Sequence, residues 1–143
     1  MKTTKYILIG GHAVSIYGFP RNTIDIDIVV PYDVKNTERL IRILSGLGYK
    51  NVTTKDGVLL SDIYALSPLE LHRYGTVTMS GTTLWMVDVL FTHKFDVLYK
   101  ASRIVHYERI PIRVVGLKDL IDMKTKAGRP QDIIDLQHLA PIK

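Results

Sequence analysis

Apolar residues follow two patterns along this chain, one that alternates with polar residues and one that recurs at helical spacing. The first thirty residues show both. Tyr6 to Ile9 is a short apolar run that stops at Gly10 and Gly11, and His12 to Phe19 continues as an amphipathic segment. This order predicts a strand, a glycine turn and a helix. Ile24 to Val30 then alternates apolar residues with aspartate, which predicts a second strand.

The rest of the chain continues with strand and helix signals. The predicted helices are Asn36–Leu47, Lys94–Ser102, a segment from Gly116 that ends at Gly128, and Pro130–Leu139. The predicted strands are Tyr49–Thr53, Val58–Leu60, Thr82–Phe91, Arg103–Tyr107 and Ile110–Val115. Pro111 predicts that the last of these is an edge strand, because proline has no N–H to donate.

Two shorter stretches give weaker signals. Asp56-Gly57 predicts a tight turn between two short strands. Ser61 to Gly81 has no clear periodicity. Within it, His72-Arg73-Tyr74 is interpreted as a surface turn in preference to a segment that faces a substrate.

These elements predict an α/β (α+β) fold, with a mixed β-sheet flanked by helices and two short helices at the C-terminus. A chain of 143 residues is the size of one ordinary domain, so we expect a single domain over residues 1–143. No apolar run reaches the length of a membrane span, and the first one is too short for a signal peptide. We therefore expect a cytoplasmic protein without a membrane partner.

The composition removes several classes of function. The chain has no cysteine, which excludes a disulfide framework, a thiolate zinc site and a cysteine nucleophile. Its five histidines lack the spacing of a zinc site. The net charge of +5 favours a polyanionic partner such as a nucleotide or RNA.

Two aspartates in the second strand are the strongest chemical signal. Asp25 and Asp27 project from one face, about 6.6 Å apart by the rise of a strand, so their charges repel. Aspartate is also disfavoured in strands. A cation between them would remove the repulsion, and magnesium is the natural candidate because it prefers hard oxygen ligands.

A third aspartate, Asp88, lies in the middle of the apolar run Thr82–Phe91. Left uncompensated there, its carboxylate would cost several kcal/mol of desolvation. Its partner is either a metal that it shares with Asp25 and Asp27, or a buried cation or turn. The first alternative requires the strands from Ile24 and from Leu84 to be neighbours.

The glycine pair adds a second chemical feature. Gly10 and Gly11 allow the backbone to approach an anion closely, and a helix that begins at His12 would direct its free N–H groups toward that anion. The sequence thus predicts a phosphate-binding turn beside a pair of metal-binding carboxylates.

Two segments carry a family resemblance. Ile9 to Gly11, followed after thirteen residues by Asp25 to Ile28, resembles the signature of the DNA polymerase β-like nucleotidyltransferase superfamily. The run Gly18-Phe19-Pro20-Arg21-Asn22-Thr23-Ile24-Asp25-Ile26-Asp27 is similar to that of its small, minimal members and of the toxin-type ones from abortive-infection systems.

The C-terminal segment adds to this resemblance. Lys124, Arg129, Asp132 and Asp135 resemble the C-terminal motif of toxin-type nucleotidyltransferases. Spacing alone favours ion pairs on a helix surface for these residues. The resemblance implies a site role for Lys124 and Asp132, and it leaves Asp135 open.

The resemblance implies an enzyme that transfers a nucleoside monophosphate from a nucleoside triphosphate, such as ATP, to an acceptor, with pyrophosphate leaving. The acceptor is a protein, an RNA or tRNA, or a small molecule. Two Mg²⁺ ions, or Mn²⁺ in their place, would be held by three catalytic carboxylates, Asp25, Asp27 and Asp88. The expected nucleotide-binding residues are Gly10, Gly11, His12, Arg21, Thr23, Lys124, Arg129 and Asp132.

Superfamily members usually select their acceptor with an additional helical domain. We therefore expect a partner chain or a homodimer to supply that part. The alternative interpretation is a non-catalytic module with the same fold, which either binds a nucleotide as a regulatory ligand or acts as an antitoxin-like partner.

Overall fold

The computed structural model describes residues 3–52, 54–55, 58–59, 71–77 and 83–142. The strands are β1 (Ile7–Ile9), β2 (Ile26–Pro31), β3 (Lys50–Asn51), β4 (Thr54–Lys55), β5 (Val58–Leu59), β6 (Leu71–Val77), β7 (Thr83–Thr92), β8 (Arg103–Tyr107) and β9 (Ile110–Val114). The helices are α1 (Gly10–Ile16), α2 (Val34–Gly46), α3 (Phe95–Ala101), α4 (Leu117–Ala127) and α5 (Pro130–Leu139).

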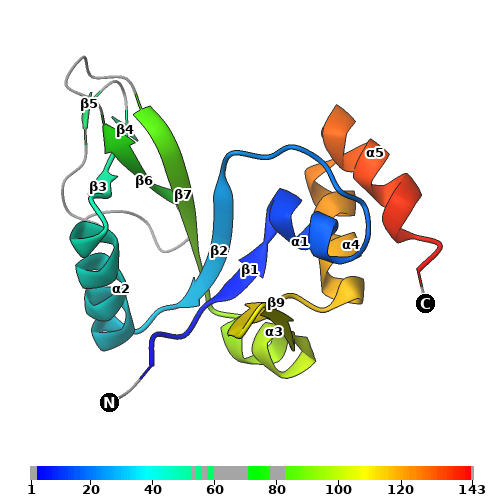
Figure 1. The fold of residues 1–143 in the computed structure, drawn as a ribbon, viewed down its shortest axis with the longest axis horizontal. Helices are drawn as coiled ribbons and strands as arrows, with labels where there is room; N and C mark the ends of the chain where they lie inside the picture. The colour runs from blue at the N-terminus through cyan, green and yellow to red at the C-terminus, as the bar shows by residue number, and fades with distance from the viewer. Residues whose placement is uncertain (1–2, 53, 56–57, 60–70, 78–82, 143) are drawn as a thin grey trace.

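Within the described ranges, seven strands form one sheet in the order β3-β6-β7-β2-β1-β9-β8, and β4 and β5 form a separate hairpin. β2 is parallel to β7 and β1 is parallel to β9, while the other neighbours are antiparallel. In Figure 1, α2 lies on one side of the strands and α1, α4 and α5 lie on the other. The mixed sheet, its flanking helices and the two C-terminal helices confirm the predicted fold class.

The central strands β2 and β7 supply much of the core. Val29, Val30 and Val89 are almost completely buried, as expected of strands covered on both faces. β2 begins at Ile26, two residues later than predicted, so Asp25 lies just before the strand. This pair of strands is the part of the sheet that carries the aspartates.

Helix α2 begins two residues before the predicted helix and packs on the core with one face. Asp33 caps its first turn, since its side chain accepts a hydrogen bond from a free backbone N–H of that turn. Leu40 and Leu44 are buried, whereas Ile43 and Leu47 are exposed. The helix therefore packs against the core through Leu40, Leu44 and the partly buried Ile41.

The predicted position of the sheet edge is wrong. β9, the strand with Pro111, lies inside the sheet between β1 and β8, and β8 is at the edge of the described sheet. The proline is tolerated because β1 pairs with β9 only at the other end, through Leu8 and Val114. Pro111 extends beyond that pairing, so its missing N–H costs no bond to β1.

The interpretation of His72-Arg73-Tyr74 as a surface turn is also wrong. These residues lie inside β6, which pairs along its length with β7, and Tyr74 is buried. The other residues of the stretch without clear periodicity, 61–70 and 78–81, lie outside the described residues, as does the predicted turn at Asp56-Gly57. No helix in the described ranges is both long and apolar enough to cross a membrane.

Candidate active site

The parallel pairing of β2 with β7 brings the sequence-predicted carboxylates together. Asp27 and Asp88 are register partners on these two strands, and Asp25 lies one step before β2. The two strands are therefore neighbours, as a site shared by the three aspartates requires. Register partners on one face of a sheet have side chains close enough to interact.

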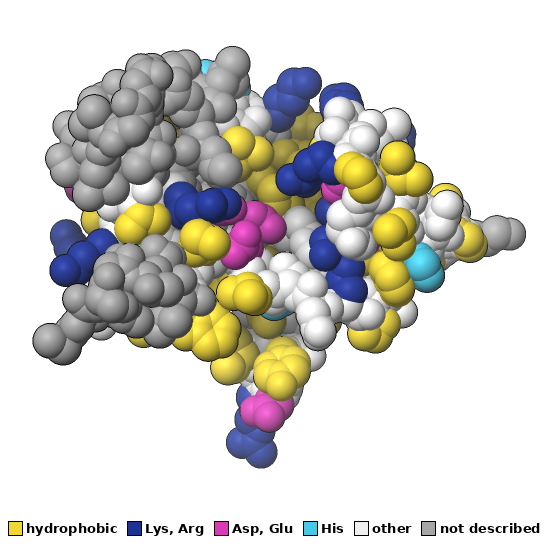
Figure 2. Space-filling view, turned by 90° about the horizontal axis from the view of Figure 1, so that it is seen from above, with side chains coloured by type: hydrophobic (Ala, Val, Ile, Leu, Met, Phe, Trp, Pro, Cys, Tyr) yellow, Lys and Arg dark blue, Asp and Glu magenta, His cyan; other side chains and the backbone are white. Residues whose placement is uncertain are grey.

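These carboxylates line a cavity of about 680 Å³. Its described lining residues come from β1, β2, β6 and β7 of the sheet, from the start of α1 and the loop after it, and from α4 and α5. The described polar residues that line it are Gly10, Gly11, Arg21, Thr23, Asp25, Asp27, Arg73, Asp88, Lys124, Lys126, Arg129, Gln131 and Asp132. Figure 2 looks onto this face and shows acidic side chains at its centre, with lysine and arginine side chains on both sides.

Negative charge is crowded around Asp27. Burial, helped by the charges of Asp88 and Asp25 and opposed by Lys124, raises the pKa of its carboxyl to about 6. A carboxyl group whose pKa is raised in this way lacks enough positive charge nearby to stabilise its ionised form. Additional positive charge beside Asp27 would therefore be electrostatically favourable.

Asp88, by contrast, has a cationic partner. Arg73 on β6 donates from Nε to Oδ1 at 2.7 Å and from Nη2 to Oδ2 at 2.9 Å. This bidentate pair is the buried-cation alternative that the sequence left open for Asp88. In the part of the chain that the structure describes, no three His, Cys, Asp or Glu side chains are gathered as a ready cation cluster.

The helical side of the cavity holds an interlocked set of charges. Lys124 Nζ donates to Asp132 Oδ1 at 3.0 Å and lies 3.0 Å from Asp135 Oδ2. Arg21 Nε lies 3.1 Å from Asp135 Oδ1. Lys124 and both aspartates are buried, so these are not the helix-surface ion pairs that spacing alone favours.

Asp132 also joins α4 to α5. Its Oδ2 accepts hydrogen bonds from the backbone N–H and from Nε of Arg129, at 3.1 and 2.8 Å. Burial alone would raise the pKa of Asp132, but the hydrogen bonds from Arg129 and Lys124 outweigh it and hold that pKa at about 2. Asp132 is therefore ionised at neutral pH and partly neutralises the cations beside it.

The glycine turn fits closely around the carboxylates. Gly10 has a φ of +71°, and a Cβ there would overlap with the carboxylate of Asp27. A Cβ at Gly11 would lie 2.8 Å from Nη2 of Arg21 and 3.0 Å from the side chain of Thr23. The two glycines thus make room for residues of the cavity itself, whatever the cavity binds.

Replacing Gly10 by alanine should destabilise the protein by about 1–3 kcal/mol, because it forces an L-residue into left-handed backbone and pushes the Asp27 carboxylate away. Urea denaturation measures the loss. Gly46→Ala is the matched control, since no atom lies near its would-be Cβ and its φ is not positive. It should be neutral or stabilise by up to about 1 kcal/mol. Equal midpoints for both variants would refute the fit at Gly10.

All but one of the predicted site residues line the cavity. The exception is His12, because α1 begins two residues earlier than predicted, at Gly10. Three polar lining residues were not predicted, namely Arg73, Lys126 and Gln131. The sequence could have indicated Arg73, because a buried Asp88 requires a cation and His72-Arg73-Tyr74 contains one.

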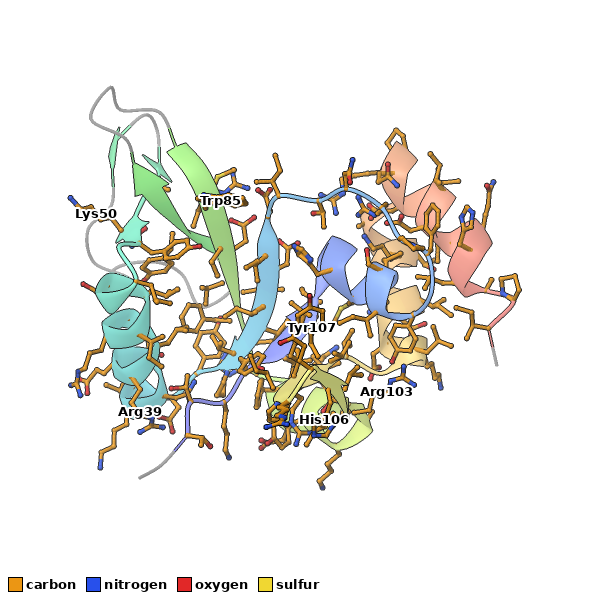
Figure 3. The ribbon with its side chains drawn as sticks, viewed as in Figure 1. Arg39, Lys50, Trp85, Arg103, His106 and Tyr107 are labelled. Carbon is orange, nitrogen blue, oxygen red and sulfur yellow. The ribbon has the colours of Figure 1, made fainter. Side chains whose placement is uncertain are left out.

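Other basic side chains lie elsewhere. Arg39 and Lys50 are on the α2 side of the sheet, and Arg103 lies on β8, at the other edge of the described sheet (Figure 3). The cations that reach the cavity therefore come from the loop after α1, from β6 and from the C-terminal helices.

The donor set suits a divalent cation. Asp25 and Asp27 offer hard carboxylate oxygens, and the raised pKa of Asp27 marks a place where positive charge would be favourable. Gly10 leaves the Asp27 carboxylate the space to stay in the cavity. The residues present thus fit magnesium or manganese.

Neither a family model nor a curated protein sequence matches this chain. Solved structures do. A lincosamide antibiotic adenylyltransferase with lincomycin bound has a TM-score of 0.64 at 16% identity, with 97% of this chain and 87% of that one covered. An antigenic nucleotidyltransferase-like protein from Paracoccidioides brasiliensis has a TM-score of 0.62 at 16% identity, over 96% and 67% of the two chains. A putative nucleotidyltransferase from Thermotoga maritima has a TM-score of 0.58 at 16% identity, over 99% and 85%. The chain therefore has the nucleotidyltransferase fold.

Proposed function

We propose that this protein is a metal-dependent nucleotidyltransferase, which transfers a nucleoside monophosphate from a nucleoside triphosphate to an acceptor. The observation that carries the proposal is the pairing of Asp27 with Asp88 across two parallel strands, opposite a cationic side built from α4 and α5. A triphosphate with a divalent cation needs both kinds of surface within one cavity.

The reaction is an in-line displacement at phosphorus. An acceptor oxygen forms a bond to the α-phosphorus, the bond from that phosphorus to the bridging oxygen breaks, and pyrophosphate leaves with the electron pair. The acceptor proton passes to a carboxylate of the cavity, for which we propose Asp88. A bound cation supplies Lewis-acid stabilisation of the phosphate oxygens.

The chain's own residues have separate roles in this proposal. Asp25 and Asp27 would hold Mg²⁺ or Mn²⁺. Arg21 and Lys124 line the cavity and would neutralise charge on the transferred phosphoryl group, with Asp135 holding both of them. Arg129 is mostly exposed at the cavity rim and suits the outer phosphates.

The acceptor is the less defined half of the reaction. Apolar side chains, Ile9, Leu90, Leu120 and Met123 among them, also line the cavity. One protein with this fold is named as a lincosamide adenylyltransferase. The proposed acceptor is a small molecule, an RNA or a protein. A partner chain or a second copy of this chain would help to select it.

Labelling tests the proposal directly. The purified protein is incubated with each α-³²P nucleoside triphosphate, magnesium and a cell extract, and the labelled species is identified. Label should appear on one acceptor with magnesium and be absent with chelator. Nucleotide binding without transfer to any molecule would support the non-catalytic, antitoxin-like or regulatory module instead.

A further inference from the structure

One row of side chains crosses the sheet at the level of the candidate site. Arg73 on β6 is the register partner of Asp88 on β7, and Asp88 is the register partner of Asp27 on β2. A cation, a carboxylate and a second carboxylate therefore stand side by side on three adjacent strands. The two cations expected from the sequence were assigned from the three carboxylates alone, without Arg73.

The guanidinium of Arg73 engages both oxygens of Asp88. The two hydrogen bonds, at 2.7 and 2.9 Å, have the parallel geometry of a fork on a carboxylate. Asp88 is almost fully buried, whereas the Arg73 side chain is 43% exposed. The carboxylate is thus fixed, while the arginine has a route to solvent.

A guanidinium in this position competes with a metal ion for Asp88. Both need the same carboxylate oxygens, and both bring positive charge into the same crowded group of aspartates. Among the residues that the structure describes, no arginine or lysine forms an ion pair with Asp25 or Asp27, so a cation can reach them without displacing one. The two halves of the carboxylate group are therefore not equivalent.

We propose that Arg73 occupies the second cation position in the resting protein, so that the cavity first binds one divalent cation through Asp25 and Asp27. A second cation binds only when Arg73 leaves Asp88. Arg73 is then a positioning residue that sets the order and number of cations. This inference rests on the proposed function, since it requires the cavity to bind a divalent cation.

Titration with Mn²⁺ alone tests the inference, with free Mn²⁺ followed by its paramagnetic resonance signal. The wild-type protein should bind one Mn²⁺ per chain, with a second at least about tenfold weaker. Arg73→Gln should bind two with similar affinity. Arg42→Gln, a change at an exposed residue of α2, should behave as wild type. Adding Asp88→Asn to Arg73→Gln should return the number to one.

Thermal unfolding gives a second readout. In chelator, Arg73→Gln should melt below wild type, because Asp88 is left buried without its guanidinium, and Mn²⁺ should restore most of the loss. Arg73→Lys, which keeps the charge and loses the fork, should lie between the two.

The titration distinguishes failure of this inference from failure of the proposed function. If wild type binds one Mn²⁺ and Arg73→Gln still binds one, or if wild type binds two with equal affinity, Arg73 does not control the second position and the proposed function survives. If neither protein binds Mn²⁺ above the level of the unfolded chain, the cation site and this inference are both wrong.

Discussion

Asp27→Asn should lower nucleotide transfer by at least about a hundredfold, which corresponds to ~2.7 kcal/mol of transition-state stabilisation, and should leave the fold intact. The reason is its place beside Asp88 at the centre of the cavity. Asparagine has the same shape but a neutral side chain, which binds a divalent cation poorly. The labelling assay measures transfer, and circular dichroism confirms the fold.

The same substitution should stabilise the protein in chelator. The pKa of Asp27 is about 6 in the folded chain, against an ordinary value near 3.8, so its charge opposes folding above that range. After allowance for screening by solvent, the gain at pH 8 should be about 1–2 kcal/mol, or roughly 2–8 °C. The gain should shrink as the pH falls through 6 and vanish below about 4.

Asp122→Asn, at an exposed position of α4, is the control and should change neither property. A lower melting temperature for Asp27→Asn in chelator at pH 8 would mean that Asp27 is a structural residue. Transfer at the wild-type rate by a correctly folded Asp27→Asn protein would remove it from the proposed mechanism.

Asp135→Asn should have the largest effect on stability, a loss of about 3–5 kcal/mol, because it leaves two buried or half-buried cations undercompensated. Asp135 is fully buried between Arg21 and Lys124, and its Oδ1 also accepts a hydrogen bond from Gln131. Differential scanning calorimetry should show a melting temperature at least about 6 °C below wild type.

Gln131→Ala separates charge from hydrogen bonding at Asp135, since it removes a neutral donor and leaves both ion pairs. It should cost no more than about 1.5 kcal/mol. An Asp135→Asn protein that melts like wild type would show that Asp132 alone compensates Lys124, and that the fold does not need the charge of Asp135.

A substitution of Lys124 needs a control lysine that lies on the same helix but outside the cavity. On a helical stripe, Lys118 and Lys126 both fall away from Leu117, Leu120, Ile121 and Lys124, so the sequence favours either as a neutral control. Lys126 lines the cavity, whereas Lys118 is exposed and does not. Lys118→Ala is therefore the suitable comparison for a Lys124 variant.

The local signals in the sequence were sufficient for much of the fold. Strand patterns predicted most of the strands, although not β6, and Gly128 and Pro130 marked the end of α4 and the start of α5 as observed. The element bounds differ by one or two residues at several ends. For example, α1 begins at Gly10 and not at His12 as predicted, and His12 does not line the cavity.

The candidate site was predictable only in part, for a physical reason. The cost of placing Asp27 and Asp88 in strands is a local property, so the sequence itself shows that these carboxylates need compensation. Which group compensates each one depends on strand order and register, which are long-range. Arg73 reaches Asp88 because β6 pairs with β7 in one register out of several that the sequence allowed.

The sequence by itself determined that this chain forms a mixed sheet with flanking helices and that its aspartates require positive charge. The tertiary structure alone decided that Arg73 supplies that charge to Asp88, and that Lys124, Asp132 and Asp135 form a buried cluster instead of surface pairs. Propensity and periodicity act over a few residues and can be read along the chain. Ion pairing and burial act between elements, so they follow only from how strands and helices pack.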